Sequence, residues 1–247
     1  MQGIASEAGR ERTQVIASDC GWGKGVGVPR GHPCAATGKD MLRVQALHRA
    51  ATRRYPRRML PADPAPTRLD AEQYFALVAR GDIRPDDRVE LLEGVVVSMS
   101  PQGSPHANAI ARINALLVPL IGTRAIVRVQ CSFRAGRYNV PEPDFAIVPG
   151  PLERWEHEHP SEALLIIEVS DSSLPTDRLS KAAIYAAAGV LQYLVVNLRG
   201  DRIEMFEGPD AALARWVETR PAFRGGHIPL AALPGLSLAV DEMLPRR

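Results

Sequence analysis

One lysine stands out in the part of the chain that follows residue 58. Between residue 59 and the C-terminus, eighteen of the nineteen basic side chains are arginine, and Lys181 is the exception. An ammonium is compact and can lie against a phosphate oxygen or a polarised water, whereas a guanidinium is a wide planar fork. In a stretch so biased toward arginine, this lysine indicates a position where the shape of the cation matters.

Two carboxylates precede this lysine. Asp144 lies in PEPDFAIV, and Glu168 ends the apolar run ALLIIEV, thirteen residues before Lys181. Magnesium typically takes one or two carboxylates, keeps several waters and completes its shell with substrate phosphate. Two carboxylates and an ammonium are therefore the inventory of a metal-dependent site that cleaves phosphodiesters. Strand ends carry carboxylates routinely, so the pair alone leaves a purely structural role open.

The spacing of Lys181 connects it to these carboxylates. Lys181 is at helical spacing from Ile184 and Tyr185, so it shares their stripe and is expected to face the sheet. A lysine that faces a core needs a charged partner, and the carboxylates are candidates. Two alternatives remain, since its ammonium could reach out to solvent along the stem or pair with Asp177 one turn earlier. Tyr185 is expected to pack against the sheet with its hydroxyl at the rim.

Alternating helices and strands must position these residues. Apolar residues at helical spacing predict helices over residues 67–81, 104–122 and 176–188. Thr67 is a possible cap for the first helix, Ser104 caps the second, and Pro119 should kink or shorten its last turn. Strands are predicted over 88–100, with a turn at Glu93–Gly94, and over 125–133, 143–148, 163–169, 192–198 and 202–208. The tail to residue 247 should add one strand and irregular packing.

At this point the chain resembles a known family. VELLEGVVVSMSPQGSPH, PEPDFAIV, IEVSDSSLPTDRLSKAAIYAAAGV and QYLVVNL are similar, in order and separation, to motifs of the Uma-type putative restriction endonucleases of the PD-(D/E)XK nuclease superfamily. The resemblance runs from about Leu69 to Pro209. It implies an α/β fold with a restriction-endonuclease-like core, in which a central mixed sheet is flanked by helices. The predicted nuclease-like domain spans residues 67–240.

The resemblance also implies roles for individual residues. Glu90 would be the helix-proximal acid, Asp144 the acid of the PD pair, Glu168 the second metal ligand and Lys181 the lysine. The commoner superfamily pattern places the lysine two residues after the acid, where this chain has Ser170; in the Uma-type family it stands in the following helix. Mg²⁺ or Mn²⁺ would be held by Asp144, Glu168 and the Val169 carbonyl, with Glu90 holding a water or a second ion.

The implied reaction is metal-assisted hydrolysis of DNA phosphodiester bonds. His106 matches the histidine of the family and could contact phosphate, although capping of the preceding loop is the favoured interpretation. Glu142 is a spare acid near Asp144. The chain departs from the family pattern at three positions that lie off the proposed site. Leu194 stands where the family usually has tryptophan, Asn197 where it has an acid and Gln192 where it often has glutamate.

Charge and composition bound the remaining possibilities. Residues 1–58 hold eleven Lys and Arg against four Asp and Glu, whereas the remainder holds nineteen against twenty-four. The basic leader lacks helical or strand periodicity, so disorder is expected; Met59 could also be the natural start. No apolar run reaches the length of a membrane helix, no signal-peptide pattern is present, and three widely spaced cysteines argue against disulfides. A cytoplasmic location is therefore expected.

Two other classes of function stay open. A nuclease-fold protein could be catalytically idle and act in binding or scaffolding, because the negative balance after residue 58 disfavours contact with DNA phosphates. Arginines gathered on one rim beside Asp144 would favour catalysis instead; the candidates are Arg112, Arg124, Arg128, Arg134 and Arg137. The second alternative is a metal-independent hydrolase that uses the carboxylates as acid and base. A homodimer is plausible, since cutting two strands often needs two sites.

Overall fold

The computed structural model describes residues 68–84 and 86–246. The leader predicted over residues 1–58 and the possible cap at Thr67 lie outside the described residues. Within the described part, no helix combines the length and the apolar character that crossing a membrane requires.

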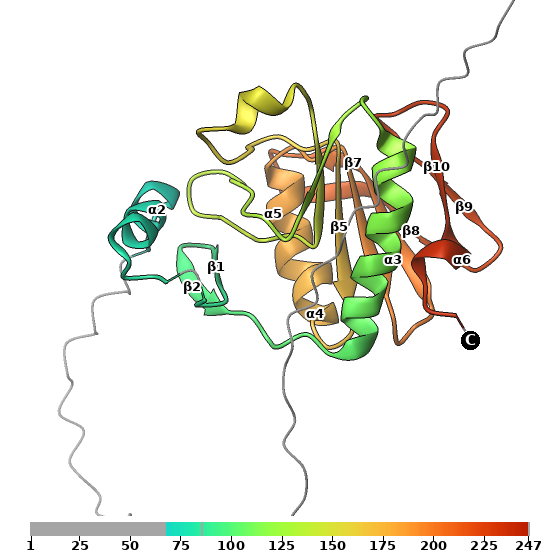
Figure 1. Cartoon of the computed structure of the whole chain (residues 1–247), viewed down its shortest axis with the longest axis horizontal. Coiled ribbons are helices and arrows are strands. Elements are labelled where there is room, and N and C mark those ends of the chain that lie inside the picture. The colour runs from blue at the N-terminus through green and yellow to red at the C-terminus, as the bar shows by residue number, and fades with distance from the viewer. Residues whose placement is uncertain (1–67, 85, 247) are drawn as a thin grey trace, which may run out of the picture. The chain divides into compact units, whose positions relative to one another are not determined.

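A six-stranded mixed sheet forms the centre of the fold (Figure 1). Its strands follow the spatial order β3-β4-β5-β6-β7-β8. Only β5 and β6 pair in parallel, and the other neighbours pair antiparallel. The bounds are β3 Ile126–Val129, β4 Phe145–Val148, β5 Leu165–Ser170, β6 Gln192–Asn197, β7 Arg202–Asp210 and β8 Arg215–Ala222. This architecture confirms the predicted α/β fold with a central mixed sheet.

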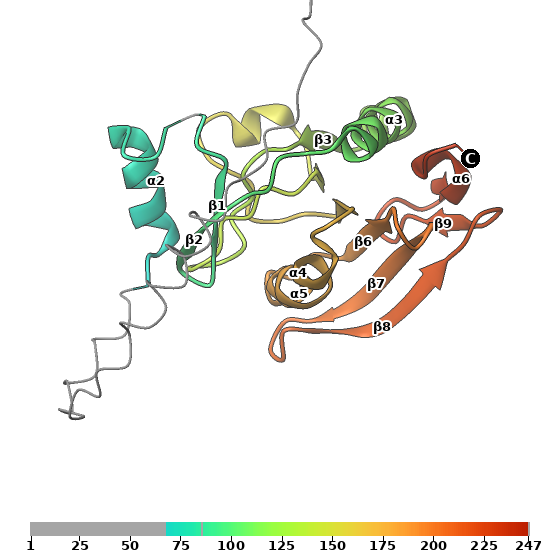
Figure 2. The same ribbon diagram turned by 90° about the horizontal axis from the view of Figure 1, so that it is seen from below.

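Side-chain alternation divides the core into two layers. Every residue of β4, β5 and β6 is buried, as expected for strands covered on both faces. One face, with Phe145, Ile167 and Val196, packs against α3 (Ser104–Ile121) through Ile113 and Leu117. The opposite face packs against α5 (Ala182–Ala187), and Figure 2 shows the two helices on either side of the sheet. Because alternation has a period of two, Asp144 and Glu168 belong to the face toward α5.

The crossover from β5 to β6 departs from the single helix predicted over 176–188. It consists of α4 (Leu174–Thr176), a π-helical turn (Asp177–Lys181) and α5, and Gly189 follows with a positive φ of 72°. A π turn is wider than an α turn and occurs frequently at functional sites. Here it contains two buried charged residues, Asp177 and Lys181. The sequence therefore predicted the helical crossover but missed the local widening.

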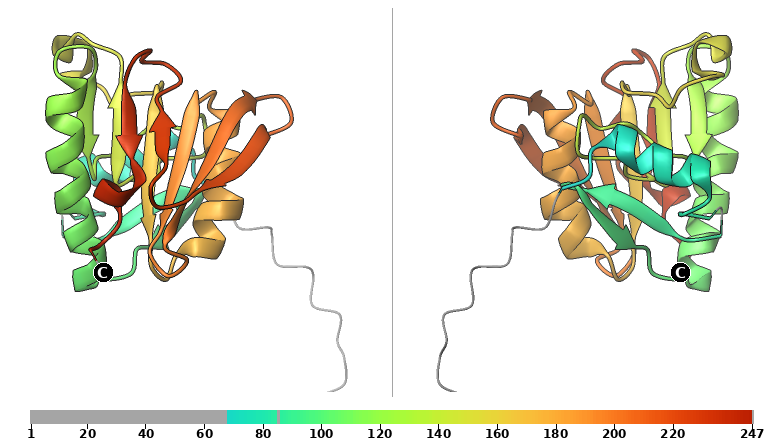
Figure 3. Two further views of the ribbon diagram at one scale, coloured as in Figure 1. Left: turned by 90° about the vertical axis from the view of Figure 1, so that its right-hand side faces the viewer. Right: turned by 90° about the vertical axis from the view of Figure 1, so that its left-hand side faces the viewer.

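The amino-terminal elements pack against the segment between β3 and β4, and in the right-hand view of Figure 3 they lie in front of the sheet. Helix α2 (Ala71–Arg80) begins at Asp70, which forms a capping box with Gln73, so the cap is Asp70 rather than Thr67. The strands β1 (Val89–Leu92) and β2 (Val95–Ser98) form a hairpin. Its turn residues Glu93 and Gly94 both have positive φ, the signature of a type I′ turn, at the predicted place.

The carboxyl-terminal tail is more regular than predicted. Beyond β8 it contributes β9 (His227–Pro229), β10 (Ser237–Ala239) and the short helix α6 (Val240–Met243). Apolar residues of these elements join α3 in the core, among them Ile228, Leu238 and Val240. The prediction of a single added strand was wrong, because the tail after residue 208 also includes the eight-residue β8, and β9 and β10 form a further pair. Helix α3 starts after Gly103 instead of being capped by Ser104, and it continues past Pro119 to Ile121.

Candidate metal and phosphodiester site

Strand pairing brings the two carboxylates of the sequence analysis together. Strands β4 and β5 are antiparallel neighbours, with Phe145 opposite Ile167. Asp144 immediately precedes β4, and its Oδ2 accepts a hydrogen bond of 2.8 Å from the backbone N–H of Val169 in β5. Glu168 lies within β5 rather than at its end. Both side chains are almost fully buried, at 7% and 4% exposure.

Lys181 joins this pair from the π-helical turn. Its Nζ lies 3.0 Å from Glu168 Oε1 and 3.2 Å from Glu90 Oε2. The ammonium is 7% exposed, which contradicts the alternative in which it reaches solvent. Asp177 is also not its direct partner, because that carboxylate accepts hydrogen bonds from Ser170 and Ser173. The structure thus places Lys181 between the acids from β1 and β5.

Tyr185 is a further contact of Glu168. Its hydroxyl donates a hydrogen bond of 2.7 Å to Glu168 Oε1, the same oxygen that faces Lys181. The ring is completely buried, so the expectation of a hydroxyl at the rim was wrong. Tyr185 lies one helical turn beyond Lys181, on the stripe that the sequence predicted. The consequence is that one oxygen of Glu168 is held by two donors from the crossover.

Asp144 is held by three donors. Besides the Val169 N–H, Gln130 Nε2 lies 3.1 Å from Asp144 Oδ1, and His106 Nε2 lies 3.2 Å from Oδ2. His106 comes from the first turn of α3, and Gln130 has a φ of 49° just after β3. The loop-capping role favoured for His106 is replaced by direct contact with Asp144. Gln130 was missed entirely, since nothing in the sequence signals a left-handed glutamine.

These residues line one cavity of about 500 Å³. Glu142 also lines it; its backbone N–H donates to Glu90 Oε2 at 3.3 Å, and its carboxylate accepts from Ser132. Acidic side chains outnumber cations in this cavity. The acids are Glu90, Glu142, Asp144, Glu168, Asp171 and Asp177, and the lysine and arginine side chains are Lys181 and Arg88.

Burial and the excess of acidic side chains shift several pKa values in this cavity. Burial, reinforced by the charges of Asp177, Asp144 and Glu90 and opposed by Lys181, raises the pKa of Glu168 to about 8. Burial likewise raises the pKa of Asp177 and of Glu142. Lys181 behaves oppositely: burial disfavours its charge, but the surrounding carboxylates outweigh burial and raise its pKa. The ammonium therefore stays charged in a site where not every acid is ionised.

Asp144 has a similar effect on His106. Burial disfavours the charged imidazole, but the hydrogen bond and charge of Asp144, together with the Val169 backbone, raise the pKa of His106. The Val169 backbone therefore lies next to the imidazole as well as next to Asp144.

The donor set suits a hard divalent cation. Asp144, Glu168 and Val169 all line the cavity, and carboxylate and carbonyl oxygens are the ligands that magnesium and manganese prefer. Within the described ranges, no three His, Cys, Asp or Glu side chains are arranged to hold a metal by themselves. A site with two carboxylates that relies on backbone oxygen and water is compatible with both observations. Acidic side chains also outnumber lysine and arginine in the cavity, which a bound cation would offset.

The arginine rim that would favour catalysis is not present. Arg112 donates to backbone oxygens of Asp241 and Glu242, whereas Arg134 pairs with Glu72 and Arg137 with Asp70. None of the five candidate arginines lines the cavity, and the arginine that does is Arg88, just before β1. Sequence reasoning placed no function on Arg88.

The three positions that depart from the family pattern lie away from the cavity. All are on β6, where Gln192 donates to Glu207 and Pro229, and Asn197 donates to Glu204. Leu194 is buried in the core layer beside α3. These three departures from the family pattern therefore affect packing rather than the residues around Lys181.

Comparisons with known proteins identify a family and a shared fold. The model of the Uma2 family, described as putative restriction endonuclease, matches residues 71–241. Among solved structures, the chain is similar to a putative nuclease belonging to DUF820 from Anabaena variabilis, with a TM-score of 0.55 and 11% identity. That match covers 71% of this chain and 97% of the other and shows a shared fold. No curated protein matches.

Proposed function

The chain belongs to the Uma2 family of putative restriction endonucleases, and from this premise we propose that it is a metal-dependent endonuclease that hydrolyses DNA phosphodiester bonds with the PD-(D/E)XK set of residues. One observation carries the proposal. A buried lysine lies within 3.2 Å of two carboxylates from different strands, and a third carboxylate, Asp144, lines the same cavity. A core that needed only stability would not require so many acids around one cation.

Asp144, Glu168 and the Val169 carbonyl would hold Mg²⁺ or Mn²⁺. When bound, the cation would polarise the scissile phosphate and lower the pKa of a water. Gln130, His106 and the Val169 N–H fix Asp144 at a single orientation. Tyr185 does the same for Glu168. Such prior orientation reduces the reorganisation that the site must undergo during reaction.

Lys181 has two roles in this proposal. Its ammonium would orient the attacking water or offset the negative charge that develops on the phosphate. Glu90 contacts the same ammonium as Glu168, and it would also hold a water or a second ion. A wide guanidinium could not occupy the same point between two carboxylates.

One observation favours the idle-scaffold alternative. The five candidate arginines do not gather beside Asp144, and the residues after 58 carry more acids than bases. Few phosphate contacts predict weak nucleic-acid binding. A homodimer and a cytoplasmic location stay predictions that accompany the proposal.

Cleavage by the purified full chain tests the proposal directly. Labelled single-stranded, duplex and branched DNA are incubated with Mg²⁺, with Mn²⁺ and with a chelator. We expect cleavage with metal, no cleavage with chelator, and no cleavage by Asp144→Asn. Glu204→Gln is the matched control, because Glu204 is a buried acid outside the cavity, and it should cleave as the parent does.

Calorimetry with Mn²⁺ separates the alternatives. Binding by the parent but not by Asp144→Asn, without cleavage of any DNA, would support an idle nuclease fold. Cleavage that persists in chelator and survives Asp144→Asn would support an acid–base hydrolase without metal.

A further inference from the structure

A second cavity adjoins the one around Lys181. It has a volume of about 700 Å³, and Arg88, Ser98, Met99, Pro101 and Gln102 line both cavities. Its size falls within the range of about 300–1,000 Å³ typical of small-ligand sites. The two cavities therefore adjoin, and together they are called the recess, which extends from the proposed metal site to the hairpin.

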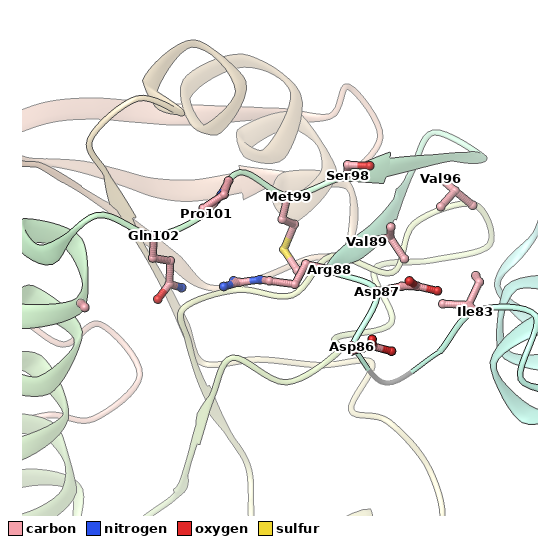
Figure 4. Close-up of a pocket in the computed structure, with 11 residues that line it drawn as sticks. Ile83, Asp86, Asp87, Arg88, Val89, Val96, Ser98, Met99, Pro101 and Gln102 are labelled. Carbon is pink, nitrogen blue, oxygen red and sulfur yellow. The ribbon is translucent and has the colours of Figure 1, made fainter. Parts of the chain in front are cut away.

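The lining of the second cavity changes along its length. At the end shared with the metal site are Arg88 and the Gln102 amide, and in Figure 4 the Arg88 side chain extends toward Gln102. At the far end are the apolar side chains of Ile83, Val89 and Val96, with Asp86 and Asp87 beside them (Figure 4). A nucleotide has the same polarity, with a charged phosphate at one end and a flat, largely apolar base with polar edges at the other.

Arg88 is the cation available to a phosphate here. In the described part of the chain, its guanidinium makes no ion pair or hydrogen bond, although its charge acts on Glu142. The two acids of the second cavity are already compensated, because Arg84 pairs with Asp87 at 3.3 Å and Asp86 at 3.8 Å. Arg88 therefore keeps an uncommitted positive charge at the junction of the two cavities.

We propose that the second cavity binds the unpaired nucleotide next to the scissile phosphate, so that the preferred substrate is single-stranded DNA or a DNA segment with an extruded base. This inference rests on the proposed function, because the metal site fixes where the scissile phosphate lies. Arg88 binds the neighbouring phosphate, and the apolar end of the cavity receives the base.

The shape of duplex DNA supports this choice of substrate. Bases inside a duplex are stacked and paired, so a protein reaches only their edges in the grooves. A base can enter a recess only after it leaves the stack. Proteins that bind duplex DNA tightly also neutralise many phosphates, whereas this recess offers one uncommitted arginine. A single strand that threads one nucleotide into the recess needs fewer such contacts.

Binding of a short fluorescein-labelled oligothymidylate, compared with a blunt hairpin duplex of similar length, tests the inference. Fluorescence anisotropy with the full chain in Ca²⁺ measures affinity without relying on cleavage. The parent should bind the oligothymidylate more tightly than the hairpin. Arg88→Ala should weaken oligothymidylate binding about tenfold and reduce the salt dependence by about one unit of slope, as the loss of one phosphate contact requires. Equal affinity of the parent for both ligands would overturn the proposal.

Two matched controls make the test specific. Arg124→Ala removes another arginine that makes no ion pair. Arg124 lies just beyond the carboxyl-terminal end of the 18-residue α3, about 27 Å from the first turn of that helix. This variant should leave oligothymidylate binding unchanged. Val96→Trp fills the apolar end and should weaken binding, whereas Val95→Trp, next to it on β2 but outside the lining of both cavities, should not. Unchanged binding in both Arg88→Ala and Val96→Trp would also overturn the proposal.

The binding test and the cleavage test can fail separately. If the parent binds oligothymidylate through Arg88 and Val96 but cleaves nothing, the nucleotide site stands and the endonuclease proposal fails. If it cleaves duplex and single strand equally well, and both variants cleave as the parent does, the endonuclease proposal stands and the nucleotide site is wrong.

Discussion

Two groups of ion pairs share the π-helical turn of the crossover and differ in the sign of their charge imbalance. The Lys181 group contains one cation, Lys181, with the carboxylates of Glu168 and Glu90. The Arg178 group contains two cations, Arg178 and Arg202, around the single carboxylate of Glu204, which Asn197 also contacts at 3.0 Å. Both groups link the crossover to the sheet.

Their carboxylates respond in opposite directions. Burial raises the pKa of Glu168 to about 8 despite the adjacent lysine. Burial would also raise the pKa of Glu204, but hydrogen bonds from Arg178 and Asn197 outweigh it and lower that pKa. The Arg178 group has more cations than acids and therefore needs no further cation. The Lys181 group lacks positive charge, which an additional cation from outside would supply.

Exchanging lysine and arginine in the two groups should have the largest effect that separates them. Lys181→Arg should reduce DNA cleavage by about 10²–10³-fold, the usual cost of losing one preorganised electrostatic group, because the planar fork does not fit between Glu90 and Glu168. Arg178→Lys should reduce cleavage by no more than a few-fold. Rates are measured with metal on a labelled DNA, and thermal unfolding confirms that both variants fold. Full activity of Lys181→Arg would remove the argument for a shape-selective cation.

Arginine is more informative than alanine at position 181. Lys181→Ala would leave two buried carboxylates without their cation, a loss that typically costs about 3–5 kcal/mol of stability. The arginine variant keeps the charge, so a loss of activity reports on geometry.

The pH dependence of stability should distinguish the two groups next. A carboxyl whose pKa is higher in the folded than in the unfolded state binds more protons when folded, so its contribution to stability falls as pH rises between the two values. For Glu168 this window extends from 4.5 to about 8. Without divalent metal, the free energy of unfolding should therefore fall between about pH 5 and pH 8, by about 4 kcal/mol at about 1.4 kcal/mol per pH unit.

Variants assign this slope to its source. Asp177, Glu142 and His106 also have raised pKa values and add slopes of the same sign, so Glu168→Gln should flatten the dependence without abolishing it. Lys181 remains charged throughout this window and adds none. Glu204→Gln should leave the slope unchanged, because the lowered pKa of Glu204 confines its effect to acid pH. Chemical denaturation in chelator, at several pH values, measures all three proteins.

Divalent metal should reverse the instability of the Lys181 group. At a concentration of about 100 times its dissociation constant, a ligand stabilises the folded state by about 2.7 kcal/mol, which for a chain of this size raises the melting temperature by about 5–10 °C. Mn²⁺ should produce this shift in the parent and in Glu204→Gln, but not in Asp144→Asn or Glu168→Gln. An equal shift in all four proteins would show that the metal binds elsewhere.

Sequence reasoning succeeded where a local pattern decides the structure. Alternation and apolar runs identified β4, β5 and β6, and Glu93–Gly94 specified the hairpin turn. The resemblance indicated Glu90, Asp144, Glu168 and Lys181 together, and the structure places them around one cavity. Their chemical roles stay predictions.

It failed where the outcome depends on contacts distant in sequence. The segment 176–188 has ordinary helical spacing, so the π turn was not visible, and the left-handed Gln130 next to Asp144 has no local signature. The distribution of the arginines is also tertiary, since Arg134 and Arg137 are engaged by acids near α2. Arg88 was overlooked because its availability depends on Arg84 pairing with the nearby aspartates.

Arg202 provides the mildest test of the comparison. Its Nε lies 3.3 Å from Glu204 Oε1, and its side chain is 37% exposed. Partly exposed ion pairs typically contribute less than about 1 kcal/mol, and Arg178 with Asn197 still satisfies Glu204 when Arg202 is removed. Arg202→Gln should therefore lower the free energy of unfolding by less than about 1 kcal/mol and leave DNA cleavage and Mn²⁺ stabilisation at parental values. A group with more cations than carboxylates should tolerate the loss of one cation. A larger loss of stability, or any loss of cleavage, would therefore show that Arg202 is not redundant and that the contrast with the Lys181 group is one of degree.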